Sequence, residues 1–181
     1  MTIDNKEIWI KVGYELFSLY GLNGLKIEPL SKSVGISKSS FYHYFADLEL
    51  FMDVLLKHHV KQSKLIALKE RNARNIDPEL INILIEHKTD LLFNRQLRIH
   101  QNIKLYATIL EESNKNVGDA FLTVWVKDLG LQLSNTQIEG IYTLALENFF
   151  LQINIDTLNY DWLSNYFKDL KKIAATFISS T

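Results

Sequence analysis

Apolar residues recur at helical spacing along almost the whole chain, and very few residues that break a helix lie between them. The segment 5–20 shows the pattern: Ile8, Val12 and Leu16 share one face, whereas Lys11 lies largely on the other. Two prolines and seven glycines in 181 residues are too few for a turn-rich β fold. The sequence therefore predicts an all-α protein of about nine helices.

Capping residues predict where many of these helices begin and end. Gly21 is expected to end the first helix, and Asp47 to begin a long helix toward residue 74. Asp77 followed by Pro78 has the form of an N-cap with a first-turn proline, and Ser134 opens a capping box. The later helices are expected at about 79–93, at 99–112 as one or two helices, and at 117–129, 135–153 and 161–178, with an interruption at Asn114–Asn116.

Two absences restrict the class of protein. Zero cysteines exclude a disulfide framework, a thiolate zinc site and a cysteine nucleophile, and they point to a reducing cytoplasm. No apolar run approaches the roughly 18 to 20 residues of a membrane span. The start, Met1–Glu7, lacks the basic flank and apolar stretch of a signal peptide. We expect a cytoplasmic protein with no membrane partner.

Charge is divided unevenly along the chain. Residues 1–74 hold 11 basic and 8 acidic groups, a net +3, whereas residues 75–181 hold 9 and 13, a net −4. Residues 1–50 alone come to −1. Nucleic-acid binding would therefore depend on a few placed groups and not on a broad basic field. The positive excess lies in a run that is either a solvated helix face or a DNA-facing one: Lys57, Lys61, Lys64, Lys69, Arg71 and Arg74.

Residues 29–45 predict two short helices joined by a turn of about three residues. Pro29 can occupy the first turn of one helix, Gly35 can end it, and Ser37 can cap the next. This is the pattern of a helix-turn-helix, whose second helix enters the DNA major groove. Phe41 and Phe45, four residues apart, are expected to face inward. The outward arc would then carry Lys38, Ser39, Tyr42 and His43, although a generic amphipathic helix could carry the same residues.

Residues 5–56 resemble the N-terminal domain of the tetracycline-repressor (TetR) family of bacterial regulators. The resemblance rests on Gly21–Leu25, Leu30–Ser40, Phe41–Phe45 and Leu50–Phe51. It implies a three-helix DNA-binding head, expected at 1–47, and a helical ligand-binding and dimerising body, expected at 48–181, with helix 48–74 connecting them. The partners it implies are an operator in double-stranded DNA, an unidentified small-molecule effector and a second copy of the chain.

The resemblance also assigns roles to residues of the head. Lys38 and Ser39 match positions that read bases, whereas Tyr42 and Tyr44 match positions that grip phosphate and sugar. The sequence departs from the family at Lys26, where a capping threonine is usual, and at Leu48, where a lysine is common. The expected DNA-binding residues are Lys26, Ser37, Lys38, Ser39, Ser40, Tyr42, His43 and Tyr44.

For the body, the resemblance implies an effector cavity for an apolar or aromatic ligand and a dimer formed by the last two helices. No cofactor or metal is expected. The expected pocket residues are Phe93, His100, Ile103, Tyr106, Phe121, Trp125 and Tyr142. The expected interface residues are Leu146, Phe149, Phe150, Ile153, Leu163, Phe167, Leu170, Ala174 and Phe177.

The resemblance implies a ligand-responsive repressor of transcription, and two other classes of function are possible for such a chain. An enzyme is not expected, because the five histidines form no recognised ligand or catalytic spacing and no phosphate-binding loop or nucleophile motif occurs. The alternative is a helical small-molecule-binding or adaptor protein that keeps the fold but has lost effective DNA binding. Asp47 and Glu49, which flank Leu48 at the start of the long helix, favour that alternative.

Overall fold

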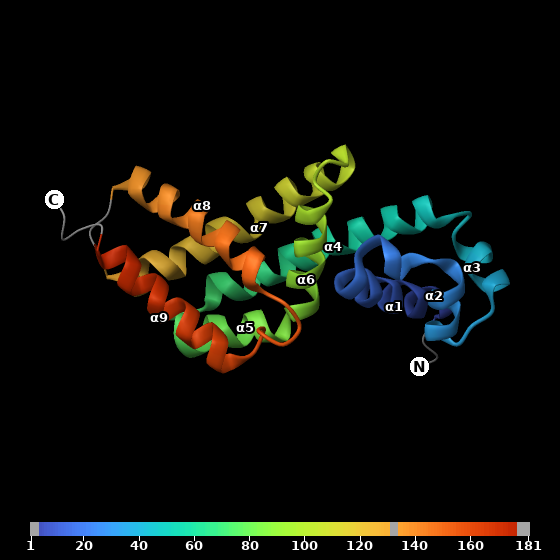
Figure 1. Ribbon diagram of the computed structural model, residues 1–181, viewed down its shortest axis with the longest axis horizontal. Coiled ribbons are helices and arrows are strands. Elements are labelled where there is room, and N and C mark those ends of the chain that lie inside the picture. Colours follow the sequence, from blue (N-terminus) through green and yellow to red (C-terminus); the bar gives the residue numbers. More distant parts are fainter. Residues whose placement is uncertain (1–3, 131–133, 177–181) are drawn as a thin grey trace. The chain divides into compact units, whose positions relative to one another are not determined.

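The computed structural model describes residues 4–130 and 134–176, and the regular elements in these ranges are all helical (Figure 1). The prediction of an all-α fold with about nine helices is confirmed, since the described ranges contain nine α-helices. The α-helices are α1 (Asn5–Tyr20), α2 (Ile27–Val34), α3 (Lys38–Tyr44), α4 (Leu48–Asn72), α5 (Ile81–Glu86), α6 (Lys88–Ile99), α7 (Lys104–Leu129), α8 (Asn135–Gln152) and α9 (Tyr160–Thr176). Two short helical turns are η1 (Gly21–Leu25) and η2 (Ile76–Leu80).

The described residues form two compact units. Unit 1 takes its residues from 1–63 and 89–113, and unit 2 takes its residues from 64–88 and 114–181. Three of the helices, α4, α6 and α7, contribute to both units, α6 by Lys88 alone. This grouping by contacts places most of α6 with the first three helices. The expected functional division into 1–47 and 48–181 is a different division and stays a prediction.

The core of the first three helices of unit 1 is aromatic. Phe41 of α3 lies at its centre, with its ring edge-on to Trp9 of α1 at 5.3 Å and to Phe51 of α4 at 5.2 Å between ring centroids. Leu30 of α2 is also fully buried, as are these three rings. Aromatic burial of this extent is the largest source of stabilisation available to so short a helix as α3.

Two glycines fix the turns around α2. Gly35 ends α2 in the left-handed conformation, with φ of 73°, and its N–H donates to the carbonyl of Ser31, as predicted for a glycine C-cap. Gly24 lies in η1 against the end of α1. A Cβ at Gly24 would lie 2.4 Å from the carbonyl oxygen of Leu16, so this close approach of two backbone segments requires glycine.

A buried polar network joins α1, α4 and α6 within unit 1. Tyr14 Oη donates to Asp90 Oδ1 at 2.8 Å and lies 2.7 Å from His59 Nδ1. Because the hydroxyl has a single proton, His59 must donate from Nδ1, which leaves its buried Nε2 without a partner among the described residues. Burial lowers the pKa of His59 to about 4. Phe93 stacks on both Tyr14 and His59, so the network is closed on one side by an aromatic ring.

In unit 2, the start of α5 differs from its predicted form. The expected N-cap, Asp77, lies in a non-helical conformation inside η2, and Asn75 takes the capping role by accepting from the N–H of Glu79 at 3.2 Å. The carboxylate of Asp77 instead accepts hydrogen bonds from Tyr160 and Ser164 of α9. Asp77 was expected to accept a hydrogen bond from a backbone N–H in the first turn of its own helix. In the structure, its carboxylate instead connects η2 to α9.

Two predicted helix boundaries are wrong and one is confirmed. Asn114–Asn116 does not interrupt a helix, because α7 runs unbroken from Lys104 to Leu129. The weak helix propensity of asparagine is overridden by burial of α7 side chains on both sides of that segment. The helix expected at 79–93 is divided, since α5 ends at Glu86 and α6 begins at Lys88. The capping box that opens α8 at Ser134 is present as predicted.

Candidate DNA-binding surface

The position of α3 is set by the residues on its two faces. Phe41 and Phe45 are buried in unit 1 and hold one face of α3 against α1 and α4. The turn from Gly35 to Ser37 joins α2 to α3, and Ser31 Oγ of α2 donates to the carbonyl of Ile36 in this turn at 2.7 Å. A helix anchored in this way presents its remaining face to solvent in a fixed orientation.

That remaining face carries the predicted DNA-binding residues. Lys38, Ser39, Tyr42 and His43 are exposed, and Ser40 and Tyr44 are half-buried. Tyr42 keeps 54 % of its surface accessible, which is high for an aromatic residue and leaves the phenol free to contact a ligand. All of these residues lie on α3, so the structure brings them together on one short helix.

Ser37 and Lys26 are the two remaining predicted residues, and both occupy N-cap positions. Ser37 precedes α3 and is exposed, but its hydroxyl lies 2.8 Å from the hydroxyl of Ser39 and makes no capping bond to the helix. Lys26 precedes α2 in extended conformation and makes no side-chain cap, as expected for a lysine. Lys26 is exposed and lies on a different element from the α3 residues.

An acidic residue that the sequence interpretation missed lies beside the predicted base reader. Glu28 of α2 places its carboxylate 3.5 Å from Lys38 Nζ and 3.9 Å from Lys32 Nζ. All three side chains are more than half exposed. The spacing of Glu28 and Lys32, four residues apart on one helix, was a sequence signal for the second pair. The contact with Lys38 crosses between helices and had no such signal.

The start of α4 carries two further acidic residues, Asp47 and Glu49, close in sequence to α3. Asp47 Oδ1 accepts from the N–H of Leu50 at 2.8 Å, so Asp47 caps α4 as predicted. Leu48 is half-buried and packs against the aromatic core, while Glu49 is exposed. The position where a phosphate-binding lysine would be expected therefore holds a core leucine between two carboxylates.

The predicted pocket residues fall into two groups, one in each unit. In unit 2, Phe121 lies 5.8 Å from Tyr142 and 6.4 Å from Trp125, measured between ring centroids. Trp125 is buried, whereas Phe121 and Tyr142 are half-buried. The other four lie in unit 1, where Phe93 and Tyr106 belong to the aromatic core, His100 is half-buried and Ile103 is exposed. Each group stays a predicted part of an effector site.

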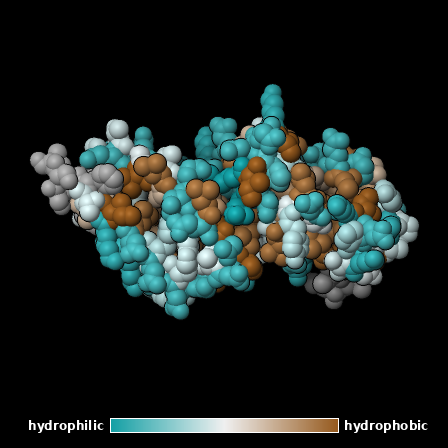
Figure 2. Space-filling model, in the orientation of Figure 1, coloured by the Kyte–Doolittle hydropathy of each residue, from teal (hydrophilic) through white to brown (hydrophobic). Residues whose placement is uncertain are grey.

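An open groove of about 520 Å³ runs between α8 and α9, and Figure 2 shows apolar surface gathered there. Leu144 of α8 and Ile173 of α9 are strongly exposed in its lining. Of the predicted interface residues, only Leu170 lines this groove. The others are buried or half-buried inside unit 2 (Leu146, Phe149, Phe150, Ile153, Leu163, Phe167 and Ala174), and Phe177 lies outside the described residues.

Two properties of the described residues bear on other classes of site. Within residues 4–130 and 134–176, no group of three or more His, Asp or Glu side chains is arranged to hold a metal ion. No helix in the same ranges combines the length and the apolar character needed to cross a membrane.

Comparison with known proteins agrees with this geometry. Residues 10–49, which contain α2 and α3, match the sequence profile described as bacterial regulatory proteins, tetR family. The whole fold is similar to that of a protein from Mesorhizobium loti MAFF303099 classed as a TetR-family transcriptional regulator, with a TM-score of 0.60, 13 % identity, and coverage of 97 % of this chain and 96 % of that one. No curated protein matches the chain in sequence. Residues 10–49 therefore match the helix-turn-helix segment of the TetR family, and the chain as a whole shares the all-helical fold of that regulator.

Proposed function

We propose that the protein is a dimeric repressor that binds operator DNA through α3 and leaves it when a small molecule binds the body. The observation that carries the proposal is the division of α3 into a buried aromatic face and an exposed face of Lys38, Ser39, Tyr42 and His43. The head is assigned to residues 1–47 and the body to residues 48–181.

Within α3, the exposed groups suit different parts of a duplex. Lys38 can donate to the O6 and N7 acceptors of guanine, and the hydroxyl of Ser39 can bond to several base edges. The phenol of Tyr42 suits phosphate, which fixes the register of the protein but carries no sequence information. Substituting Tyr42 is therefore expected to weaken binding to all sequences, whereas substituting Lys38 changes sequence preference.

Dimerisation is supported by the groove between α8 and α9. Ile141 and Leu144 of α8 face Leu170 and Ile173 of α9 across it. Large apolar side chains left accessible in this way favour burial by a second copy of the same surface, in a four-helix arrangement of two α8–α9 pairs. A dimer supplies the two heads that a pair of DNA half-sites requires, with the half-sites about 34 to 36 Å apart.

An effector is supported by the aromatic group of Phe121, Trp125 and Tyr142 in unit 2. Aromatic walls with a few polar tips suit a small molecule that carries an apolar or aromatic frame. Such a ligand releases the operator only if it binds the state with unsuitable head spacing more tightly than the DNA-binding state. Repression relieved by the ligand then follows from that difference in affinity.

The test of this function is an electrophoretic mobility shift with DNA from upstream of the gene that encodes the protein. We expect a sequence-preferring shift at low salt, lost with Tyr42→Ala and altered in preference with Lys38→Ala. A control, Tyr20→Ala, changes an exposed tyrosine of α1 outside the predicted surface. If no sequence-preferring shift occurs at low salt, the repressor function is wrong.

A second candidate function is favoured by the acidic residues around the surface. Glu28 lies against Lys38, and Asp47 and Glu49 flank the start of α4. These carboxylates repel the phosphates of DNA. Acidic residues at this surface are therefore consistent with a small-molecule-binding or adaptor protein that lacks effective DNA binding. The same mobility shift separates the two functions.

A further inference from the structure

A buried acid without a partner lies in unit 2. Glu70 of α4 is 0 % exposed, and neither of its carboxyl oxygens has a hydrogen-bond partner. Within the described part of unit 2, these are the only fully buried side-chain polar atoms left without one. The other buried polar residues of this unit, His87 and Ser164, contact Lys69 and Asp77 respectively. Glu70 is therefore an exception in an otherwise satisfied core.

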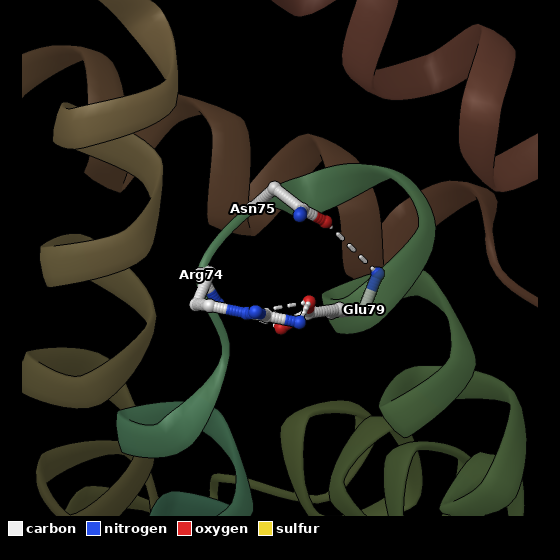
Figure 3. Close-up of polar contacts among 3 residues, drawn as sticks. All are labelled: Arg74, Asn75 and Glu79. Atoms are coloured by element: carbon white, nitrogen blue, oxygen red, sulfur yellow. Dashed lines mark hydrogen bonds and ion pairs between the residues drawn. The ribbon is translucent and has the colours of Figure 1, made fainter.

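Two basic residues close to Glu70 in sequence, Lys69 and Arg74, are engaged elsewhere, and the adjacent Arg71 is exposed. Lys69 Nζ donates to Glu86 at 2.5 Å and lies 3.0 Å from His87. Figure 3 shows Arg74 folded onto Glu79, which accepts from the backbone N–H of Arg74 at 2.8 Å and from its guanidinium at 3.0 and 2.7 Å. Burial alone raises the pKa of Glu70 to about 8, with no neighbouring charge contributing. The described chain thus supplies no counter-charge to this carboxyl.

The surroundings of Glu70 on its own helix are apolar. Ile66 and Ala67, one turn earlier on the same face of α4, are both buried. Because burial raises the pKa of Glu70 to about 8, the carboxyl keeps its proton at neutral pH, but its two oxygens are still buried without a hydrogen-bond partner, which lowers the stability of the fold. Groups held at this cost are concentrated at functional sites.

We propose that Glu70 is the anionic anchor of the effector site and that the effector is an organic cation, an ammonium or amidinium group on an apolar frame. The inference rests on the proposed function and narrows the class of its ligand. When the cation binds, Glu70 releases its proton to solvent, and the resulting carboxylate accepts a charge-assisted hydrogen bond from the cation. An amidinium can bond to both oxygens at once. The aromatic group of Phe121, Trp125 and Tyr142 in the same unit suits the apolar frame.

The position of Glu70 along the chain also connects the ligand to DNA binding. Helix α4 is continuous from Leu48 to Asn72, so Glu70 belongs to the helix that begins directly after the connection from α3. A cation that bonds to Glu70 satisfies its two buried carboxyl oxygens and so stabilises one arrangement of α4. A difference in free energy between two arrangements is what a ligand needs to shift their populations.

The experiment uses the full chain and two matched pairs of probes, 4-phenylbutylamine with 4-phenylbutan-1-ol, and benzamidine with benzamide. Binding is measured by isothermal titration calorimetry to the wild type, to Glu70→Gln, to Glu70→Asp and to Glu139→Gln. Glu139 is an exposed glutamate of α8 in the same unit, so its variant is a control for the change in net charge. Circular dichroism confirms that each variant is folded.

We expect at least one cation to bind about tenfold more tightly than its neutral partner to the wild type and to Glu139→Gln, a difference of about 1.4 kcal/mol. In Glu70→Gln the preference should fall below about threefold, and in Glu70→Asp, which keeps the charge, it should persist in part. Equal binding of the paired probes, a preference that survives Glu70→Gln, or the absence of any charge-dependent binding would each overturn the assignment.

A parallel measurement separates this assignment from the proposed function. Fluorescence anisotropy of the labelled upstream DNA is followed as each probe is added. If a cation binds through Glu70 but DNA affinity does not change, the cation site stands and the ligand-responsive repressor is wrong. If a neutral probe releases DNA equally from the wild type and from Glu70→Gln, the repressor stands and the cation site is wrong.

Discussion

Glu28 and Lys38 lie 3.5 Å apart, carboxylate oxygen to ammonium nitrogen, although they belong to different helices of the helix-turn-helix. Lys38 is the predicted base reader, so it must exchange this carboxylate for a base edge or a phosphate when DNA binds. An exposed ion pair of this kind contributes about 0 to 1 kcal/mol, so breaking it reduces the free energy of DNA binding by at most that amount. Glu28 is therefore expected to set both the strength and the salt dependence of DNA binding.

The first prediction concerns Glu28→Gln. Removing the carboxylate should tighten binding to a random-sequence duplex at low salt by roughly two- to tenfold, because Lys38 is released and a repulsion of phosphate is lost. The slope of log affinity against log salt should steepen by about one, the value expected for one more phosphate contact. Fluorescence anisotropy across a salt series measures both quantities.

The matched control is Glu7→Gln, an exposed glutamate of α1 with the same change in net charge. Its effect on affinity should be clearly smaller than that of Glu28→Gln. Equal effects of the two variants would show that net charge, and not the contact with Lys38, controls binding.

The second prediction concerns the buried network of unit 1. Tyr14→Phe keeps the ring stacked on Phe93 but removes the hydroxyl that bonds to Asp90 and His59. Buried polar atoms that lose a partner cost about 1 to 3 kcal/mol, so the urea midpoint should fall accordingly. Tyr20→Phe, the same change at a 61 % exposed position of α1, should stay within about 0.5 kcal/mol of the wild type. Similar midpoints for both variants would contradict the importance of the network.

The third prediction is a pH dependence that arises from Glu70. Burial raises the pKa of Glu70 from 4.5 to about 8, so the folded chain retains a proton that the unfolded chain releases. The free energy of unfolding should therefore be highest below about pH 4.5 for this group and decline as pH rises toward about 8. In Glu70→Gln this decline should be absent, as measured by urea unfolding at several pH values. An unchanged decline in the variant would assign it to other groups.

The fourth prediction concerns the close approach of η1 to α1. Gly24→Ala places a Cβ 2.4 Å from the carbonyl oxygen of Leu16, and backbone atoms cannot yield as a flexible side chain can. We expect a loss of about 1 to 3 kcal/mol in the free energy of unfolding. Gly140→Ala in α8, where nothing lies within 4 Å of the new Cβ, should instead stabilise by about 0.5 to 1 kcal/mol. A thermal midpoint for Gly24→Ala at or above the wild-type value would refute the steric argument.

The fifth prediction concerns dimerisation through the groove between α8 and α9. Leu144→Glu introduces a charge into its apolar lining and should convert the dimer to monomer in sedimentation or size-exclusion measurements. Leu151→Glu is the control, because Leu151 is 78 % exposed on the same helix but does not line the groove. A dimer that survives Leu144→Glu, or that is lost equally with Leu151→Glu, would place the interface elsewhere.

The sequence by itself determined the helical fold and the position of the helix-turn-helix. Local signals were sufficient for these, since Gly35 terminates α2 through its own conformation and Ser134 caps α8 through residues three positions away. The spacing of Phe41 and Phe45 was likewise enough to predict which face of α3 is exposed. Signals of this kind depend on neighbours within about one helical turn, which a single sequence records directly.

Only the tertiary structure decided which polar groups meet across helices. The local sequence predicts Asp77 as an N-cap, whereas its carboxylate accepts a hydrogen bond from Ser164 of α9. The spacing of Glu28 predicts an ion pair with Lys32, and the structure adds a contact with Lys38. In the sequence, Glu70 lies between Lys69 and Arg71, and such a run of charged residues favours a solvated helix face. In the structure, Glu70 lies on the buried, apolar face of α4. Such contacts join residues far apart in the chain, and their energies depend on burial, which helical periodicity alone does not specify.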